Sequence, residues 1–233
     1  MIRRPPRSTL DRSSAASDVY KRQYLMWALI PINDFSESFS RLSEHLDSDR
    51  RRELTQILAT QVFEALCSIR SIEKIVVLSN EKEWLKSFDN QKITILKDPE
   101  IKKLKAKITH AAKWIQNQGI EQMLYLSVDL PFVQEADIAK FIADHQGGLS
   151  IVKAHKENGT NALILDLPET LEFQFGVNSF DKHLAAAKAQ KINTKILKIK
   201  NLSLDIDTWN DLQEFKKSSM NTQFLNFIRR HNL

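Results

Sequence analysis

The chain has 233 residues, of which 42% are hydrophobic and 27% are charged, a composition typical of a globular protein with one core. Cys67 is its single cysteine, which excludes an internal disulfide framework and favours the reducing cytoplasm. No hydrophobic run reaches the length of a membrane span, so no membrane partner is expected.

The net charge of +5 comes mainly from the first 23 residues. This segment holds six basic and two acidic side chains, which leaves the remaining chain at a net charge of about +1. The remaining chain has no cluster of Lys and Arg interleaved with aromatic residues, so nucleic acid is not an expected partner.

Residues 1–23 are rich in Arg, Ser and Pro and show no apolar periodicity, which predicts disorder. They lack the apolar centre of a secretory signal, and their acidic residues and prolines argue against a transit peptide. They resemble the translated adapter read-through that occurs at the start of proteins predicted from raw sequencing assemblies. We therefore interpret residues 1–23 as a non-native leader, Met26 as the native start, and residues 24–233 as one domain.

The first half of this domain alternates hydrophobic runs with amphipathic stretches. The patterns predict strands over 24–32, 75–78, 93–96 and 123–128, and helices over 49–69, 81–88, 105–118 and 134–144. The long helix over 49–69 has Leu54, Leu58 and Val62 on one face, and Ser48 is its expected N-cap.

The second half begins with two predicted strands, 149–154 and 162–165, around a polar hairpin-like segment. An alanine-rich helix over 178–190, a strand over 195–199 and a helix over 208–217 follow, and the residues from Ser218 onward predict a loosely attached helix. Alternating strands and helices imply βαβ units with right-handed crossovers. The predicted fold class is therefore α/β, a three-layer, Rossmann-like arrangement with a mostly parallel sheet.

Two carboxylates each follow a short apolar strand. Asp129 follows the predicted strand 123–128 and lies two residues before Pro131. Asp207 is the last residue of the stretch 205–207. Ligands of α/β sheets bind outside the carboxyl ends of the strands, where two such carboxylates could converge on Mg²⁺. The alternatives are a turn or helix-entry role for Asp129, and a lead into the capping box Thr208–Asp211 for Asp207.

The stretch 175–180 precedes the alanine-rich helix and suits an anion. A helix N-terminus offers unpaired N–H groups and the positive end of a dipole, Gly176 allows close approach of the backbone, and the Ser179 hydroxyl can donate a hydrogen bond. Thr160 could face the same pocket. The alternatives are an N-cap role for Asn178 or Ser179, a tight turn at 159–161, and a packed or surface position for His183.

Five motifs occur in one order: MWALIP at 26–31, SVDLP at 127–131, GTNAL at 159–163, FGxxSFxxH at 175–183 and DIDT at 205–208. Over about residues 26–215 the ordered set resembles the 2-phospho-L-lactate or phosphoenolpyruvate guanylyltransferase family of deazaflavin coenzyme biosynthesis. The resemblance implies a nucleotide-diphospho-sugar-transferase-like fold. It also implies a Mg²⁺-dependent transfer of GMP from GTP to the phosphate of phosphoenolpyruvate or 2-phospholactate, with release of pyrophosphate.

By position in the family motifs, Thr160, Gly176 and Ser179 would bind the acceptor. Asp129 and Asp207 would hold Mg²⁺ and, with Arg41, form the catalytic group. GTP and a small phospho-acid are thus the expected partners, and a homodimer is a further possibility. An acceptor that is already an anion needs metal, positive charge and in-line positioning rather than a strong general base.

The chain departs from the family pattern in the motifs assigned to the nucleotide. Family members usually carry Lys at the position of Asn33 and Ala-Lys-Ser-Arg-Leu at 38–42, where only Arg41 remains as a cation. A Gly-Leu-Asn motif is replaced by Lys-Ile-Thr at 107–109, and Lys105 and Lys107 are expected to be solvated surface lysines. Two alternative functions follow: a catalytically weak homologue that binds a phospho-acid, and a related nucleotidyltransferase with another base or acceptor.

Overall fold

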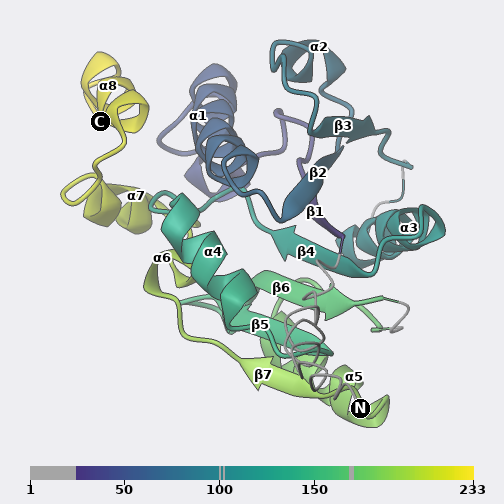
Figure 1. Cartoon of the computed structure of the whole chain (residues 1–233). Coiled ribbons are helices and arrows are strands. Elements are labelled where there is room, and N and C mark those ends of the chain that lie inside the picture. Colours follow the sequence, from purple (N-terminus) through teal and green to yellow (C-terminus); the bar gives the residue numbers. More distant parts are fainter. Residues whose placement is uncertain (1–24, 100, 102, 168–170) are drawn as a thin grey trace, which may run out of the picture.

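A computed structural model describes residues 25–99, 101, 103–167 and 171–233. The leader predicted at residues 1–23, with Tyr24, lies outside the described residues. Figure 1 shows a central sheet with helices on both of its faces. Its described strands are β1 (Met26–Pro31), β2 (Ile72–Leu78), β3 (Ile93–Leu96), β4 (Gln122–Leu126), β5 (Leu149–Lys153), β6 (Thr160–Asp166) and β7 (Thr194–Ile196).

The sheet has the strand order β3-β2-β1-β4-β6-β5-β7. β1 pairs in parallel with β2 and β4, β2 pairs in parallel with β3, and β7 pairs in parallel with β5. Only β6 runs antiparallel to its described neighbours, β4 and β5. The predicted mostly parallel sheet and the hairpin-like segment are confirmed, and the start of β6 lies beside the end of β4.

Two helical layers cover the sheet, as predicted. The core on one face contains buried residues of α1 (Ser48–Cys67), α2 (Lys82–Leu85), α4 (Glu135–Ala143) and α6 (Lys200–Ser203). The core on the other face contains residues of α3 (Leu104–Asn117) and α5 (Ser179–Ala189). The N-cap prediction for α1 is wrong, because the Asp47 carboxylate rather than Ser48 accepts a hydrogen bond from the Arg50 N–H (2.9 Å).

A third hydrophobic cluster lies outside the two sheet faces. It joins the first half of α1 to the short 3₁₀ helix η1 (Ser40–Leu42), α7 (Trp209–Phe215) and α8 (Thr222–Arg230). Phe224 and Phe227 of α8 are 0% exposed, so the prediction of a loosely attached C-terminal helix is wrong. Phe224, Phe227 and Ile228 fall on one face of a helix, which gives α8 an apolar stripe that packs against α1 (Figure 1).

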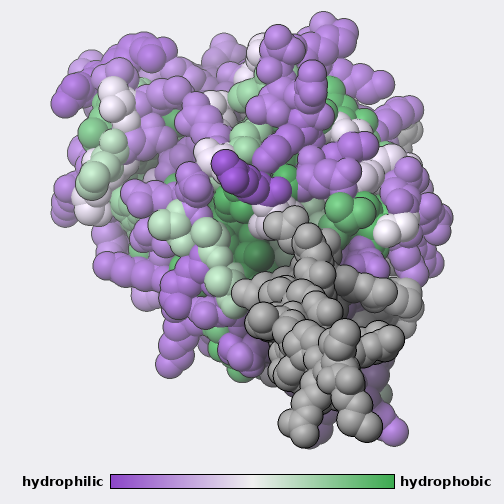
Figure 2. All heavy atoms as spheres, viewed as in Figure 1, coloured by the Kyte–Doolittle hydropathy of each residue, from purple (hydrophilic) through white to green (hydrophobic). Residues whose placement is uncertain are grey.

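Hydrophilic residues cover most of the face shown in Figure 2, and hydrophobic residues are visible near its centre and in smaller patches on both sides. Among the described residues, no helix combines the length and hydropathy needed to cross a membrane.

We predict that Phe227→Ala lowers the free energy of unfolding by about 3–4 kcal/mol, because it removes a fully buried ring and leaves a cavity. Met220→Ala is the control, since that side chain is 83% exposed in the segment before α8 and its loss should change stability by less than about 0.5 kcal/mol. Urea denaturation measures both values. Equal, small effects would contradict the packed position of α8.

Candidate active site

Two backbone hydrogen bonds join three chain segments just beyond the end of β4. The Ile206 N–H donates to the Asp129 carbonyl (3.0 Å), and the Ser127 N–H donates to the Asn161 carbonyl (2.9 Å). Ile206 lies between Asp205 and Asp207, so the first bond brings these carboxylates to Asp129. The second bond holds the start of β6 at the same edge of the sheet.

The pKa values of all three carboxylates are raised, chiefly by burial. Burial raises the pKa of Asp129 to about 6, although the Ser127 hydroxyl donates to its Oδ1 (2.6 Å), and the charge of Asp207 adds to the increase. Burial and then the charge of Asp129 raise the pKa of Asp205 to about 7. Burial also raises the pKa of Asp207, against the charge of Arg41. The sequence interpretation overlooked Asp205, although its alternation with Asp207 in the DIDT motif is the available signal.

Asp129 and Asp207 line a cleft of about 340 Å³ that also receives residues from the end of β1 and from η1. Their donor atoms are all carboxylate oxygens, which suit a hard cation. In the described part of the chain, no three His, Cys, Asp or Glu side chains are arranged to hold a metal ion together. Two carboxylates, with the remaining positions left to water and phosphate oxygens, is the usual set for Mg²⁺, and the residues therefore fit that ion.

Arg41 is the only cation among the described residues that line this cleft. Both of its terminal nitrogens contact the Glu157 carboxylate, with 3.1 Å between Nη2 and Oε2, and Nη1 lies 3.7 Å from Asp207 Oδ2. Neutral Asn33 lines the same cleft. Arg41 thus connects η1 to the β5–β6 hairpin and balances part of the acidic charge.

A second cavity of about 410 Å³ adjoins the cleft, since Asn33 and Glu37 line both. Lys107 lines this cavity, forms an ion pair with Asp98 and keeps only 18% of its side chain exposed. The prediction of a solvated surface lysine is therefore wrong for Lys107, because the buried Asp98 carboxylate binds its ammonium group. Lys105 lines neither cavity.

The structure brings the predicted acceptor residues Thr160 and Ser179 into one buried cluster. The Ser179 hydroxyl donates to Thr160 Oγ1 (3.3 Å), and Thr160 Oγ1 lies 3.0 Å from Nδ1 of His183. His183 is 0% exposed, so of the packed and surface positions that the sequence left open it occupies the packed one. Gly176 has a φ of +109°, a conformation that favours glycine, and no atom lies within 4 Å of the position a Cβ would take.

A β-bulge turns Thr160 towards α5. Val152 pairs with Ala162 but Lys153 pairs with Thr160, so β6 contains one extra residue at this point. Ala162 packs in the core beneath α1 and α4, whereas Thr160 bonds to residues of α5 on the opposite face. Bulges re-aim side chains in this way, and without this one Thr160 would face away from Ser179.

The N-terminus of α5 uses some of its own N–H groups. Ser179 N–H donates to the Gly176 carbonyl and Phe180 N–H to the Asn158 carbonyl, each over 3.0 Å. Asn178 occupies the N-cap position with a left-handed backbone, and its side chain makes no capping bond. The hydroxyl pair is therefore a better donor to an anion here than these two amides.

The capping box at the start of α7 is present, with the Thr208 hydroxyl and the Asp211 carboxylate as its two members. Those bonds leave the Asp207 carboxylate outside the box. The Asp207 side chain therefore lines the cleft and does not cap the helix.

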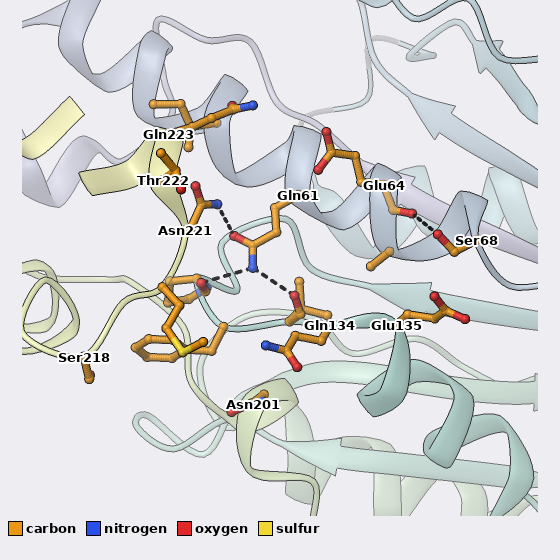
Figure 3. A pocket seen from close by; sticks show the side chains of 16 residues that line it. Gln61, Glu64, Ser68, Gln134, Glu135, Asn201, Ser218, Asn221, Thr222 and Gln223 are labelled. Atoms are coloured by element: carbon orange, nitrogen blue, oxygen red, sulfur yellow. Dashed lines mark hydrogen bonds between the residues drawn. The ribbon is translucent and has the colours of Figure 1, made fainter. Parts of the chain in front are cut away.

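A larger cavity, of about 760 Å³, lies elsewhere, between α1, the loop after β4 and the segment before α8 (Figure 3). Gln61 donates to the carbonyls of Pro131 (3.2 Å) and Val133 (2.8 Å) and accepts from Asn221 (2.5 Å), as Figure 3 shows. None of the predicted site residues lines this cavity. The charged groups suited to phosphate chemistry lie in the smaller cleft.

The chain is similar to one family of known proteins, the guanylyl transferases. The family model described as "Guanylyl transferase CofC like" matches residues 26–233. A phosphoenolpyruvate guanylyltransferase of Chloroflexus aggregans is 31% identical over 191 residues, which cover 80% of this chain and 94% of that protein. A 2-phospho-L-lactate guanylyltransferase of Methanobrevibacter ruminantium is 26% identical over 214 residues, which cover 87% of this chain and 90% of that protein.

Solved structures confirm the predicted fold class. A protein of Desulfovibrio desulfuricans, described as a nucleotide-diphospho-sugar transferase, superposes with a TM-score of 0.73 at 13% identity, covering 90% of this chain and 96% of the other. A 4-diphosphocytidyl-2C-methyl-D-erythritol synthase of Anaerococcus prevotii gives a TM-score of 0.56 at 13% identity, covering 81% of this chain and 93% of the other.

The raised carboxylate pKa values predict that the metal-free protein loses stability as the pH rises from about 4 to about 7, since only the folded state keeps these protons there. Asp205→Asn should therefore unfold with a free energy higher by on the order of 1–2 kcal/mol at about pH 8, and with an unchanged one at about pH 4. Urea denaturation in a chelator measures this, with exposed Asp89→Asn as the control. A loss of stability of Asp205→Asn at the higher pH would contradict the raised pKa of this carboxylate.

Proposed function

The chain belongs to the CofC-like guanylyl transferase family, and we propose that it transfers GMP from GTP to the phosphate of phosphoenolpyruvate or 2-phospho-L-lactate, releasing pyrophosphate. The observation that carries this proposal is the meeting of Asp129 and Asp207 beside Arg41 at the carboxyl end of the sheet. That edge is where α/β folds bind nucleotides. A cleft with paired carboxylates and one guanidinium suits phosphate groups that arrive with a divalent cation.

We further propose Mg²⁺ as the cofactor, held by Asp129 and Asp207. When bound, it would neutralise charge on the triphosphate and on the departing pyrophosphate. Arg41 would contact the same phosphates, for which it would exchange one of its contacts with Glu157. The carboxylate repulsion in the metal-free cleft would then be relieved by the ligands themselves.

The acceptor would lie against Thr160 and Ser179, whose hydroxyl cluster is joined to the cleft through the Asn161–Ser127 backbone bond. An oxygen of the acceptor phosphate attacks the α-phosphorus of GTP, and the bond from that phosphorus to the oxygen bridging the β-phosphate breaks. Pyrophosphate leaves with the electron pair of that bond. Because the attacking oxygen is already anionic, the chain needs to orient it rather than to remove a proton.

By resemblance, the product would enter the biosynthesis of a deazaflavin coenzyme in the cytoplasm. That destination, the cytoplasmic location, the homodimer and the division into a leader and one domain stay predictions.

A second candidate function is a phospho-acid-binding homologue with weak catalysis. The specific observation in its favour is the shortage of positive charge in the cleft: Asn33 is neutral, and Arg41 is already paired with Glu157. The hydroxyl cluster for the acceptor does not depend on either residue.

We expect pyrophosphate release when GTP, Mg²⁺ and either phosphoenolpyruvate or 2-phospho-L-lactate are supplied together, and none when the acceptor is omitted. Replacing GTP by ATP, CTP or UTP tests the base, and ³¹P NMR of the product identifies the new diphosphate linkage. Acceptor binding without turnover would favour the second candidate. Turnover with another nucleotide but not with GTP would contradict guanylyl transfer.

Asp129→Asn should abolish turnover and also remove the Mg²⁺-induced rise in melting temperature, because only an ion bound by the folded state can produce that rise. Without metal the variant should be at least as stable as the wild type at about pH 8, since one repelling charge is gone. Differential scanning fluorimetry with and without Mg²⁺ measures both effects.

Asp166→Asn is the matched control for this variant. The Asp166 carboxylate lies at the far end of β6 and accepts from the Gly148 N–H (2.7 Å) and from Gln122 (2.8 Å), so its loss should lower the melting temperature and keep the Mg²⁺ shift. The metal assignment is wrong if Asp129→Asn is destabilised and still responds to Mg²⁺.

A further inference from the structure

We propose that His183 is a positioning residue for the acceptor: it fixes the hydrogen-bond arrangement of Thr160 and Ser179 so that one hydroxyl hydrogen is left for an anionic oxygen. The inference rests on the proposed function for the identity of that anion. It adds to that function a residue that does not itself touch the substrate.

The first step is the tautomer of the His183 ring. The Gln174 backbone N–H donates to Nε2 over 2.9 Å, and a backbone N–H can act only as a donor, so Nε2 carries no hydrogen. Burial lowers the pKa of His183 to about 4, which leaves the ring neutral at neutral pH. A neutral imidazole has one N–H, and here it must be at Nδ1.

The second step is a count of hydrogens. The Nδ1–H donates to Thr160 Oγ1 over 3.0 Å, and the two hydroxyl oxygens lie 3.3 Å apart. The cluster holds three hydrogens, one on the ring and one on each hydroxyl, and its two contacts use two of them. Whichever hydroxyl donates to the other, one hydroxyl hydrogen remains, and no other group in the described part of the chain accepts it.

The third step concerns the ligand that would accept this hydrogen. The ammonium group of Lys153 lies 5.5 Å from the centre of the Phe180 ring. Because Phe180 follows Ser179 in the first turn of α5, this contact adds positive charge at the start of the helix. The open space around Gly176 gives a ligand room nearby. A free hydroxyl donor, a cation and a helix N-terminus together favour an anion such as a phosphate or carboxylate group.

The fourth step is the rigidity of the ring. Phe175 and Phe173 contact the imidazole edge-on, with centroid distances of 5.0 and 6.4 Å, and the ring is fully buried. Packing and the Gln174 bond thus hold His183 in one orientation. The ring can fix the hydrogen positions of the hydroxyl pair without moving when a ligand binds.

Two substitutions separate positioning from simple packing. An Asn amide reaches about as far as Nδ1 and can still donate to Thr160, whereas a Gln amide reaches about as far as Nε2 and can still accept from Gln174. We expect His183→Asn to keep the acceptor KM within about twofold and His183→Gln to raise it about tenfold, with little change in the GTP KM. In a Thr160→Val background, the two variants should no longer differ in acceptor KM. Equal effects of the two substitutions with Thr160 intact would overturn the proposal.

A measurement that needs no turnover tests the same inference. ¹⁵N NMR of the histidine-labelled protein should show His183 as the neutral Nδ1–H tautomer, identified by the signal missing from His183→Gln. Phosphoenolpyruvate should shift this signal in the wild type but not in Thr160→Val. An Nε2–H tautomer, or a shift that Thr160→Val retains, would overturn the inference. Failure of the proposed function is distinct, because wild-type protein would then give no pyrophosphate while the NMR result still decides the role of His183.

Discussion

The hydrogen bond from the Ile206 N–H to the Asp129 carbonyl is the constraint on which the site depends. It joins the end of β4 to the 205–207 segment, which follows α6 much later in the chain. Once that bond is formed, Asp205 and Asp207 must lie near Asp129, and the cost of burying these carboxylates beside one another falls on the folded state. The proposed cation would offset this cost, so the site would become more stable when the ion binds.

The antiparallel pairing of β6 with β4 brings a second group of polar side chains, the hydroxyl cluster at the start of β6, to the same edge of the sheet. Because β6 starts where β4 ends, Thr160 lies at the same edge of the sheet as Asp129, and the bulge in β6 turns it towards Ser179 and His183. Arg41 joins the acidic segment to the β5–β6 hairpin through its contacts with Asp207 and Glu157. A transfer between two phosphates needs this kind of arrangement, with negative charge balanced on one side and an oriented anion on the other.

Periodicity was sufficient to predict the layers of the fold, and the predicted strand 93–96 coincides with β3. Asp129, Asp207, Thr160 and Ser179 could be proposed as site residues from the sequence because each lies in a short motif beside a strand or helix end. Two errors arise from partners elsewhere in the chain, since the burial of α8 depends on α1 and the burial of Lys107 depends on Asp98. The N-cap error is local, because Asp47 and Ser48 are adjacent residues that can both cap a helix. The role proposed for His183 depends on Gln174 and on a bulge that the sequence does not mark.

The central claim is that Asp129 and Asp207 form one cation site that the nucleotide completes. Mn²⁺ binding, followed by the loss of the free-ion signal in electron paramagnetic resonance, tests it directly, because Mn²⁺ accepts the same oxygen ligands as Mg²⁺. The account predicts that the protein and GTP together bind Mn²⁺ more tightly than either alone, and that Asp207→Asn removes this gain. Equal Mn²⁺ binding by the wild type and Asp207→Asn in the presence of GTP would contradict it.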